Sequence, residues 1–147
     1  ENCRSVETKR MIKTYSKGNI THLTDDFCAY EFDCHCDRSS CDKTYVSMTM
    51  IEKLQKMRKK TGYPITITSG TRCALHQQDL RSQGVETSIG PSSHEQGIGC
   101  DIICGAFSGE QLAVIAKECG FKNIGIAKRF IHVDEREGGP REWRYSA

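Results

Sequence analysis

The stretch Ser92-Ser93-His94-Glu95-Gln96-Gly97-Ile98-Gly99-Cys100-Asp101-Ile102-Ile103 decides the fold. His94 and Asp101 stand seven residues apart in it, with two glycines between them and apolar residues after the aspartate. Glycine allows the backbone to turn sharply, and an apolar run after a turn is typical of a buried strand. We therefore predict a loop that carries His94, a turn, and a strand that opens at Asp101.

A second short strand with one histidine follows near the end of the chain, at Phe130-Ile131-His132-Val133-Asp134. Two imidazoles and one carboxylate are the ligand set of a catalytic zinc site whose fourth position is left for water. Successive side chains of a strand point to opposite faces, so Asp101 can face a metal while its two neighbours point to the core. We expect His94, Asp101 and His132 to bind Zn²⁺.

The regular elements around these motifs predict an α+β fold. Apolar residues at helical spacing predict a helix over 47–61 that stops at Gly62, and a capping pair at Ser108 and Gln111 predicts another that ends at Gly120. A short helix is expected over 74–81. Strands are expected over 65–69, 121–127 and 130–134, the last two as a hairpin. The expected architecture is a small, mainly antiparallel sheet with helices on one face and the zinc site on the other.

The bulk composition is that of one folded domain. A chain of 147 residues is long enough for a substantial core. Residues 1–24 are polar and basic, so we expect a partly ordered arm there, with a short helix around 6–15, before a single domain over 25–147. The net charge of +2 gives no argument for nucleic acid, and no apolar run reaches membrane-spanning length. We also expect a monomer and, because the sequence starts at Glu1 rather than Met, a leader removed before this numbering begins.

Nine cysteines are many for a chain of this length, and they cannot all pair with one another. Cys34, Cys36 and Cys41 lie in a polar loop with too little apolar material to fold by burial alone, which indicates a covalent or metal staple. Three interpretations stay open: disulfides, a second zinc ion with Cys73 as the fourth ligand, or unpaired thiols. Disulfides are favoured over zinc if the protein works outside the cytoplasm.

Four motifs occur in order along the chain. They are an opening segment at 26–34, the strand Ile65-Thr66-Ile67-Thr68-Ser69-Gly70-Thr71-Arg72-Cys73, the pattern Ser-x-His-x-x-Gly-x-x-x-Asp at 92–101, and Phe-Ile-His-Val-Asp at 130–134. Together they resemble the D-alanyl-D-alanine carboxypeptidase and L-alanyl-D-glutamate endolysin family of zinc peptidases, whose fold is related to lysostaphin and the Hedgehog signalling domain. The chain departs from the family at Thr71, where Tyr is usual, at Gly99, where Ala is usual, and at Gln77, where Asn commonly follows His76.

The resemblance implies a zinc metallopeptidase that hydrolyses peptidoglycan stem peptides, as a D,D-carboxypeptidase or endopeptidase or as an L-alanyl-D-glutamate endopeptidase. Such an endolysin or wall-remodelling enzyme acts outside the cytoplasm at the bacterial cell wall, whether periplasmic, secreted or phage-delivered. By the same resemblance Arg72 holds the substrate carboxylate or the developing oxyanion, a task that suits a planar guanidinium. Ser92 is expected to bond within its loop or to the substrate.

The general base is predicted from strand alternation. Asp134 shares a strand face with His132, so its carboxylate is expected beside the attacking water. Glu95, which adjoins His94, is the competing carboxylate. Some relatives place an acidic base three residues before the last histidine, but this chain has Arg129 there, which cannot serve.

Two other functions stay open beside the enzyme. One is a catalytically silent zinc-containing binding domain, and the other is a cysteine-stapled wall-binding module without hydrolysis. An acidic base and a carboxylate-holding arginine beside the zinc ligands distinguish the enzyme from both. Asp134 and Arg72 therefore favour the peptidase.

Overall fold

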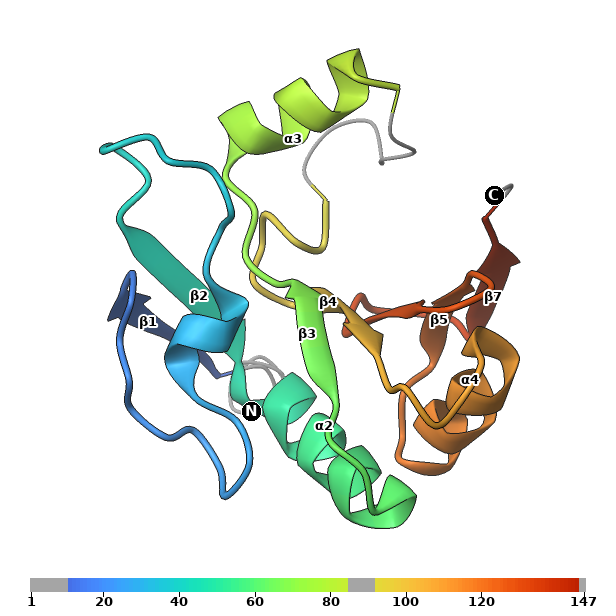
Figure 1. Ribbon diagram of the computed structural model, residues 1–147. Helices are drawn as coiled ribbons and strands as arrows, with labels where there is room; N and C mark the ends of the chain where they lie inside the picture. Colours follow the sequence, from blue (N-terminus) through green and yellow to red (C-terminus); the bar gives the residue numbers. More distant parts are fainter. Residues whose placement is uncertain (1–10, 85–91, 146–147) are drawn as a thin grey trace.

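The structure, a computed structural model, describes residues 11–84 and 92–145. Its elements follow the chain in the order β1 (Ile12–Ser16), a short 3-10 helix η1 (Ala29–Phe32), β2 (Lys43–Ser47), α2 (Met48–Thr61), β3 (Thr66–Ser69), α3 (Ala74–Ser82), β4 (Gly99–Ile103), α4 (Gly109–Glu118), β5 (Asn123–Ile126), β6 (Ile131–Asp134) and β7 (Arg141–Arg144). Figure 1 shows their arrangement.

The central element is a sheet of five strands in the order β3-β4-β6-β5-β7. Neighbours in it are antiparallel except β5 and β7, which run parallel. In the β4–β6 pair Asp101 stands directly opposite His132. The predicted α+β class with a mainly antiparallel sheet is confirmed, and the sheet itself brings two of the expected zinc ligands together.

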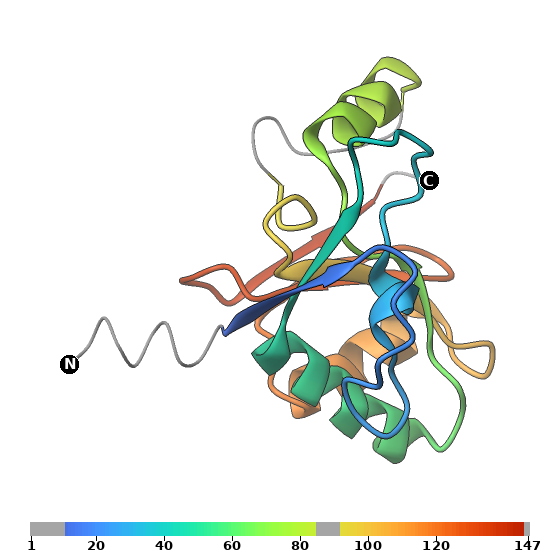
Figure 2. The same cartoon turned by 90° about the vertical axis from the view of Figure 1, so that its left-hand side faces the viewer.

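The hydrophobic core lies between one face of the sheet and the helices α2 and α4. Cys100 and Ile102 of β4 and Ile131 and Val133 of β6 are fully buried in it. Because side chains alternate along a strand, Asp101 and His132 point to the opposite face. Figure 2 shows α2 and α4 on one side of the sheet and α3 on the other, so only two of the three helices share the core face.

The two core helices begin and end where the sequence predicts. The Ser47 hydroxyl caps α2 by accepting from the Met50 N–H at 3.3 Å, and Gly62 ends it in the left-handed conformation with φ of 72°. In α4 the Ser108 hydroxyl accepts from the Gln111 N–H at 3.2 Å, while the Gln111 side chain accepts from the Ser108 N–H at 2.8 Å. This reciprocal pair is the predicted capping box.

The strand predictions differ from the structure mainly at their ends. β4 begins at Gly99, two residues before the expected start at Asp101. The hairpin of β5 and β6 is present, and its strands are shorter than predicted, because the chain from Ala127 to Phe130 forms the turn, with an Ala127 N–H bond to the Phe130 carbonyl at 2.9 Å.

Three strands are absent from the sequence predictions: β1, β2 and β7. The helix expected around 6–15 is wrong where the structure describes it, since Ile12–Ser16 forms β1 and pairs with β2; residues 1–10 lie outside the described part. The polar tail contains β7, which pairs with β5. The side chains of β1 and β7 are mostly exposed, so these two strands gain their order by completing backbone hydrogen bonds with a neighbouring strand, a tertiary effect.

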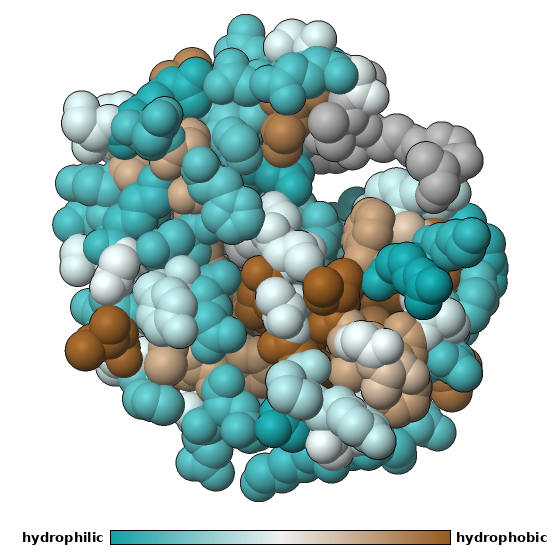
Figure 3. Space-filling model, in the orientation of Figure 1, coloured by the Kyte–Doolittle hydropathy of each residue, from teal (hydrophilic) through white to brown (hydrophobic). Residues whose placement is uncertain are grey.

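The described surface includes exposed apolar side chains, among them Ile20 and Val114. The face in Figure 3 is largely hydrophilic, and its hydrophobic residues form separate patches. None of the helices in the described ranges has the length and apolar character that crossing a membrane requires.

Candidate metal centre

Three side chains from three parts of the fold converge above the sheet. His94 comes from the loop before β4, Asp101 from β4 and His132 from β6, and one ligand atom from each lies within 4.8 Å of the others. Asp101 Oδ1 lies 2.9 Å from His132 Nδ1 and 3.3 Å from His94 Nε2. All three predicted ligands are therefore brought together.

A tight turn returns the chain from His94 to β4. The Gly97 N–H bonds the His94 carbonyl at 3.2 Å, and Gly97 has φ of 75°. A Cβ atom on Gly97 would lie 2.8 Å from the Tyr45 carbonyl oxygen of β2. Glycine is required here both for the conformation and for the close approach of β2.

The second nitrogen of each imidazole is held by another group. His94 Nδ1 donates to the Gly70 carbonyl at 2.8 Å. His132 Nε2 lies 2.8 Å from Asp134 Oδ2 and 3.1 Å from the Ser93 hydroxyl. This leaves His94 Nε2 and His132 Nδ1 for a metal, with both rings fixed by outer partners as metal-binding histidines are.

The spacing of the ligand atoms fits a small tetrahedral ion. Zinc binds nitrogen and oxygen at about 2.0–2.1 Å, so two ligand atoms at tetrahedral angles stand about 3.3 Å apart. The separation of His94 Nε2 from Asp101 Oδ1 is 3.3 Å. The residues present therefore fit a zinc ion with three protein ligands.

The site is strongly polar and mostly shielded from solvent. Burial lowers the pKa of His94. Burial also disfavours charge on His132, but hydrogen bonds to Asp101 and Asp134 outweigh it and raise the His132 pKa to about 9. Burial alone would raise the pKa of Asp101, but hydrogen bonds from His132 and His94 outweigh this effect and lower the Asp101 pKa. Without metal, a proton on His132 therefore holds the two carboxylates together.

Arg72 follows β3 after Gly70 and Thr71, and it lies beside the three ligands. Its Nη1 donates to Gln77 Oε1 at 2.9 Å, and its Nη2 donates to the Ser69 hydroxyl at 2.8 Å and lies 3.8 Å from Asp101 Oδ2. Burial lowers its pKa, and the charge of Asp101 partly offsets this. Its buried Nε has no hydrogen-bond partner among the described residues.

Asp134 is buried and fully engaged. Its Oδ2 contacts His132 Nε2, and its Oδ1 accepts from the Arg136 N–H at 3.0 Å and from Arg136 Nε at 3.1 Å. These contacts lie on the side of the His132 ring that faces away from Asp101. The geometry favours a positioning role for Asp134, and its role as base stays a prediction.

The two serines before His94 have different partners. The Ser92 hydroxyl accepts from the Glu95 N–H at 3.2 Å, a bond within the loop. Ser93, which the sequence analysis did not select, contacts His132. A Cβ on Gly99 would lie 2.7 Å from Ser93 Cβ, so the serine occupies space that an alanine at position 99 would need.

Two further residues near the site were missed. Gln77 is buried and orients Arg72 by accepting a hydrogen bond from it. The sequence signal for this role is the position of Gln77 directly after His76, where the family commonly has Asn. Trp143 of β7 stands with Gly125 and His132 in one cross-strand row, its ring 5.6 Å from the imidazole. A Cβ on Gly125 would lie 2.6 Å from the Trp143 Nε1, so the indole needs glycine beneath it.

The cysteine loop contains no disulfide, which corrects the favoured expectation. Every cysteine in the described ranges is free, and Cys3 lies outside them. The sulfurs of Cys36 and Cys73 are 3.7 Å apart, whereas a disulfide bond needs about 2.05 Å. Four of the thiols gather instead in a second group of possible metal ligands: Cys34, Cys36, Cys41 and Cys73.

Comparison with known proteins identifies the class. The sequence profile of the Peptidase M15 family matches residues 25–134, most of the chain, and the chain belongs to this family. The matched region contains the three zinc-ligand candidates and Arg72. The resemblance to this class of peptidases is therefore confirmed, and the protein is a hydrolase of the peptidase type.

One solved structure is also similar, the Serratia marcescens L-Ala D-Glu endopeptidase ChiX. The match has 18% sequence identity and a TM-score of 0.48, and it covers 62% of this chain and 80% of that chain. A comparison with curated proteins finds no match.

Proposed function

We propose that the protein is a zinc-dependent peptidase that hydrolyses peptide bonds in peptidoglycan stem peptides. The observation that carries the proposal is the convergence of His94, Asp101 and His132, with the second nitrogen of each imidazole already held. A metal site of this kind, in a chain of the Peptidase M15 family, supports hydrolysis rather than a purely structural role.

The three ligands would hold one Zn²⁺ ion. When bound, zinc acts as a Lewis acid toward a carbonyl and lowers the pKa of water toward neutrality. Among the residues that the structure describes, three possible ligands converge, so a bound zinc ion would have a coordination position left for the reacting groups.

Arg72 would bind the negative charge of the substrate, either its terminal carboxylate or the developing oxyanion. Gln77 and Ser69 fix the plane of the guanidinium, and Asp101 lies on one side of it. A buried, oriented cation acts strongly on such a charge because little water screens it.

The general base is one of two carboxylates. Asp134 is held by His132 and Arg136, so its contacts favour the positioning of His132. Glu95, which lies half-buried beside His94, is the other candidate for the base.

The place of action that suits this substrate is the bacterial cell wall, outside the cytoplasm. The absence of disulfides among the described cysteines favours a chain that folds in a reducing compartment before it reaches the wall, as a phage-delivered enzyme does. We propose that it acts as a monomer.

The test is digestion of defined muropeptides by the zinc-loaded protein, with the products weighed by mass spectrometry. Loss of a terminal D-alanine indicates a D,D-carboxypeptidase, and separation of L-alanine from the rest of the stem indicates an L-alanyl-D-glutamate endopeptidase. A His94→Ala, Asp101→Ala variant is the control and should release nothing. If the zinc-loaded wild type releases no product from any muropeptide, the silent zinc domain replaces the enzyme.

A further inference from the structure

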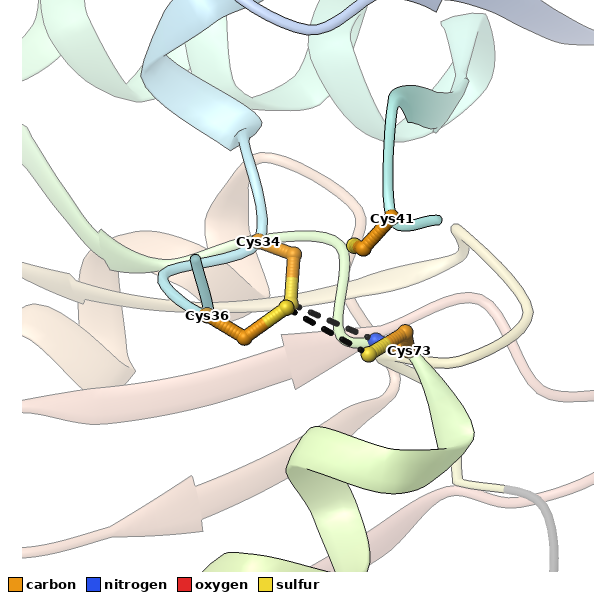
Figure 4. Close-up of side chains that lie close together, drawn as sticks. All are labelled: Cys34, Cys36, Cys41 and Cys73. Carbon is orange, nitrogen blue, oxygen red and sulfur yellow. Dashed lines mark hydrogen bonds between the residues drawn. The ribbon is translucent and has the colours of Figure 1, made fainter. Parts of the chain in front are cut away.

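Four cysteines from distant parts of the chain form a second cluster on the side of the domain where α3 lies. Cys34 and Cys36 follow η1, Cys41 precedes β2, and Cys73 caps the N-terminus of α3. Figure 4 shows their side chains directed toward one another. All four sulfurs lie within 4.8 Å of one another.

The separation of the sulfurs matches a shared metal ion. Zinc binds thiolate at about 2.3 Å, which places two sulfurs of a tetrahedral site about 3.8 Å apart. Cys36 Sγ and Cys73 Sγ are 3.7 Å apart. Four thiols at this spacing are the complete ligand set of a structural zinc site, which has no open position.

The surroundings of the cluster suit thiolates. The Cys73 N–H donates to Cys34 Sγ at 3.5 Å, the His76 N–H donates to Cys73 Sγ at 3.4 Å, and Lys17 Nζ donates to Cys41 Sγ at 3.7 Å. Such donors offset the negative charge that four thiolates bring to one divalent ion.

The local fold needs a staple of this kind. Between η1 and β2 the chain contains no helix or strand, and most of its side chains are exposed or only partly buried. Apart from the cysteines, the ion pair of Arg38 with Asp79 at 2.8 Å connects this loop to α3. Because Cys73 directly follows Arg72, a metal here would also fix the end of β3 that presents the arginine.

We propose that Cys34, Cys36, Cys41 and Cys73 bind one structural Zn²⁺ ion, separate from the metal centre at His94. The ion ties the loop after η1 to the start of α3 and holds Arg72 in position. The proposal does not depend on the peptidase activity.

The test measures zinc in the full chain, purified with a reductant, against matched variants. Wild type should carry one equivalent more zinc than the Cys36→Ser, Cys41→Ser double variant. Cys28→Ser is the control, because Cys28 is partly buried and free but lies outside the cluster, and it should keep the wild-type content. His94→Ala should lose the other equivalent and keep the cysteine-bound one.

Cobalt substitution identifies the ligands in the wild-type protein, so this test does not depend on whether the cysteine variants fold. Co²⁺ in the wild-type protein and in His94→Ala should show the near-ultraviolet charge-transfer band of thiolate coordination. Either of two results overturns the proposal: wild-type protein whose bound cobalt lacks this band, or wild-type zinc that is lost completely in His94→Ala. Mass mapping that finds the four cysteines joined as disulfides after purification with a reductant overturns it as well.

Discussion

His132 shows how a strand residue can be positioned to bind a metal. Asp101 opposite it contacts one ring nitrogen at 2.9 Å, and Asp134 two residues later contacts the other at 2.8 Å. The ring is therefore fixed between two carboxylates that serve different purposes. In the proposed zinc site Asp101 would share the metal with His132, and Asp134 would set the orientation of the imidazole.

Asp134→Asn tests this division of tasks. The amide keeps the shape but loses the charge, so we expect zinc affinity to fall by ~10–100-fold, the usual effect of removing an outer partner of a metal ligand. Competition with a zinc chelator measures it, and Glu137→Gln, an exposed acidic residue that follows Arg136, serves as the control.

The opposite outcome restores the prediction from strand alternation. If Asp134→Asn keeps wild-type zinc affinity while its turnover drops by ~10²–10⁴-fold, Asp134 is the base. In that case Glu95→Gln should turn over normally, whereas the assignment of Glu95 as base requires it to be nearly inactive with its zinc retained.

Arg72 variants separate its two possible contacts with the substrate. We expect Arg72→Ala to lower kcat by ~10²–10³-fold if the guanidinium stabilises the oxyanion. If it binds a terminal carboxylate, KM should rise instead, and only for substrates with a free C-terminus. Arg72→Lys keeps the charge without the planar fork and should recover only part of the activity. Equal activity of all three proteins on both kinds of substrate contradicts either role.

Among the elements, α4 depends on its first turn. Both bonds of its capping box are present, and α4 places its buried Leu112 and Ala116 against the sheet. The helix thus packs against β5 and β6, on the face opposite the metal centre.

Ser108→Ala should therefore destabilise the whole domain. Loss of a serine N-cap costs ~0.5–2 kcal/mol, and in a chain of this size each kcal/mol lowers Tm by about 2–4 °C. Thermal unfolding followed by circular dichroism measures the change. Val114→Ala, on the exposed side of α4 at 57% exposure, is the control and should change stability by no more than ~0.5 kcal/mol. A Tm equal to wild type for Ser108→Ala contradicts the prediction.

For the whole molecule, the state of the metal centre couples stability to pH. His132 has a pKa of about 9 in the folded, metal-free protein, above the ordinary value of 6.5. Protonation thus favours the folded state. The stabilisation is complete below about pH 6.5 and is lost as the pH rises through about 9.

We expect the metal-free protein to lose stability between pH 6.5 and 9 and its zinc affinity to rise over the same range, because zinc and the proton compete for His132. Urea unfolding in a chelator measures the first effect, and zinc titration measures the second. The His132→Gln variant should not show this loss of stability, which distinguishes the titration of His132 from that of the cysteines. If the stability of His132→Gln declines by the same amount over this pH range, other groups cause the effect.

The sequence by itself determined the class of the protein, its core elements and the three residues that converge at the metal centre. It could do so because local signals carry this information: helical spacing in α2, the capping box of α4, and one histidine or aspartate among the apolar residues of each buried strand. Alternation then placed Asp101 and His132 on the face away from the core, as observed.

Only the tertiary structure decided what depends on contacts between distant segments. β1 and β7 order by pairing with strand edges that the local sequence does not reveal, and β7 brings Trp143 beside His132. Side-chain alternation placed Asp134 on the same face as His132. The orientation of the imidazole, however, brings the Asp134 carboxylate to Nε2, the ring nitrogen that faces away from Asp101. The four cysteines meet because the end of η1, the start of β2 and the start of α3 lie near one point, and spacing along the chain does not encode such a meeting.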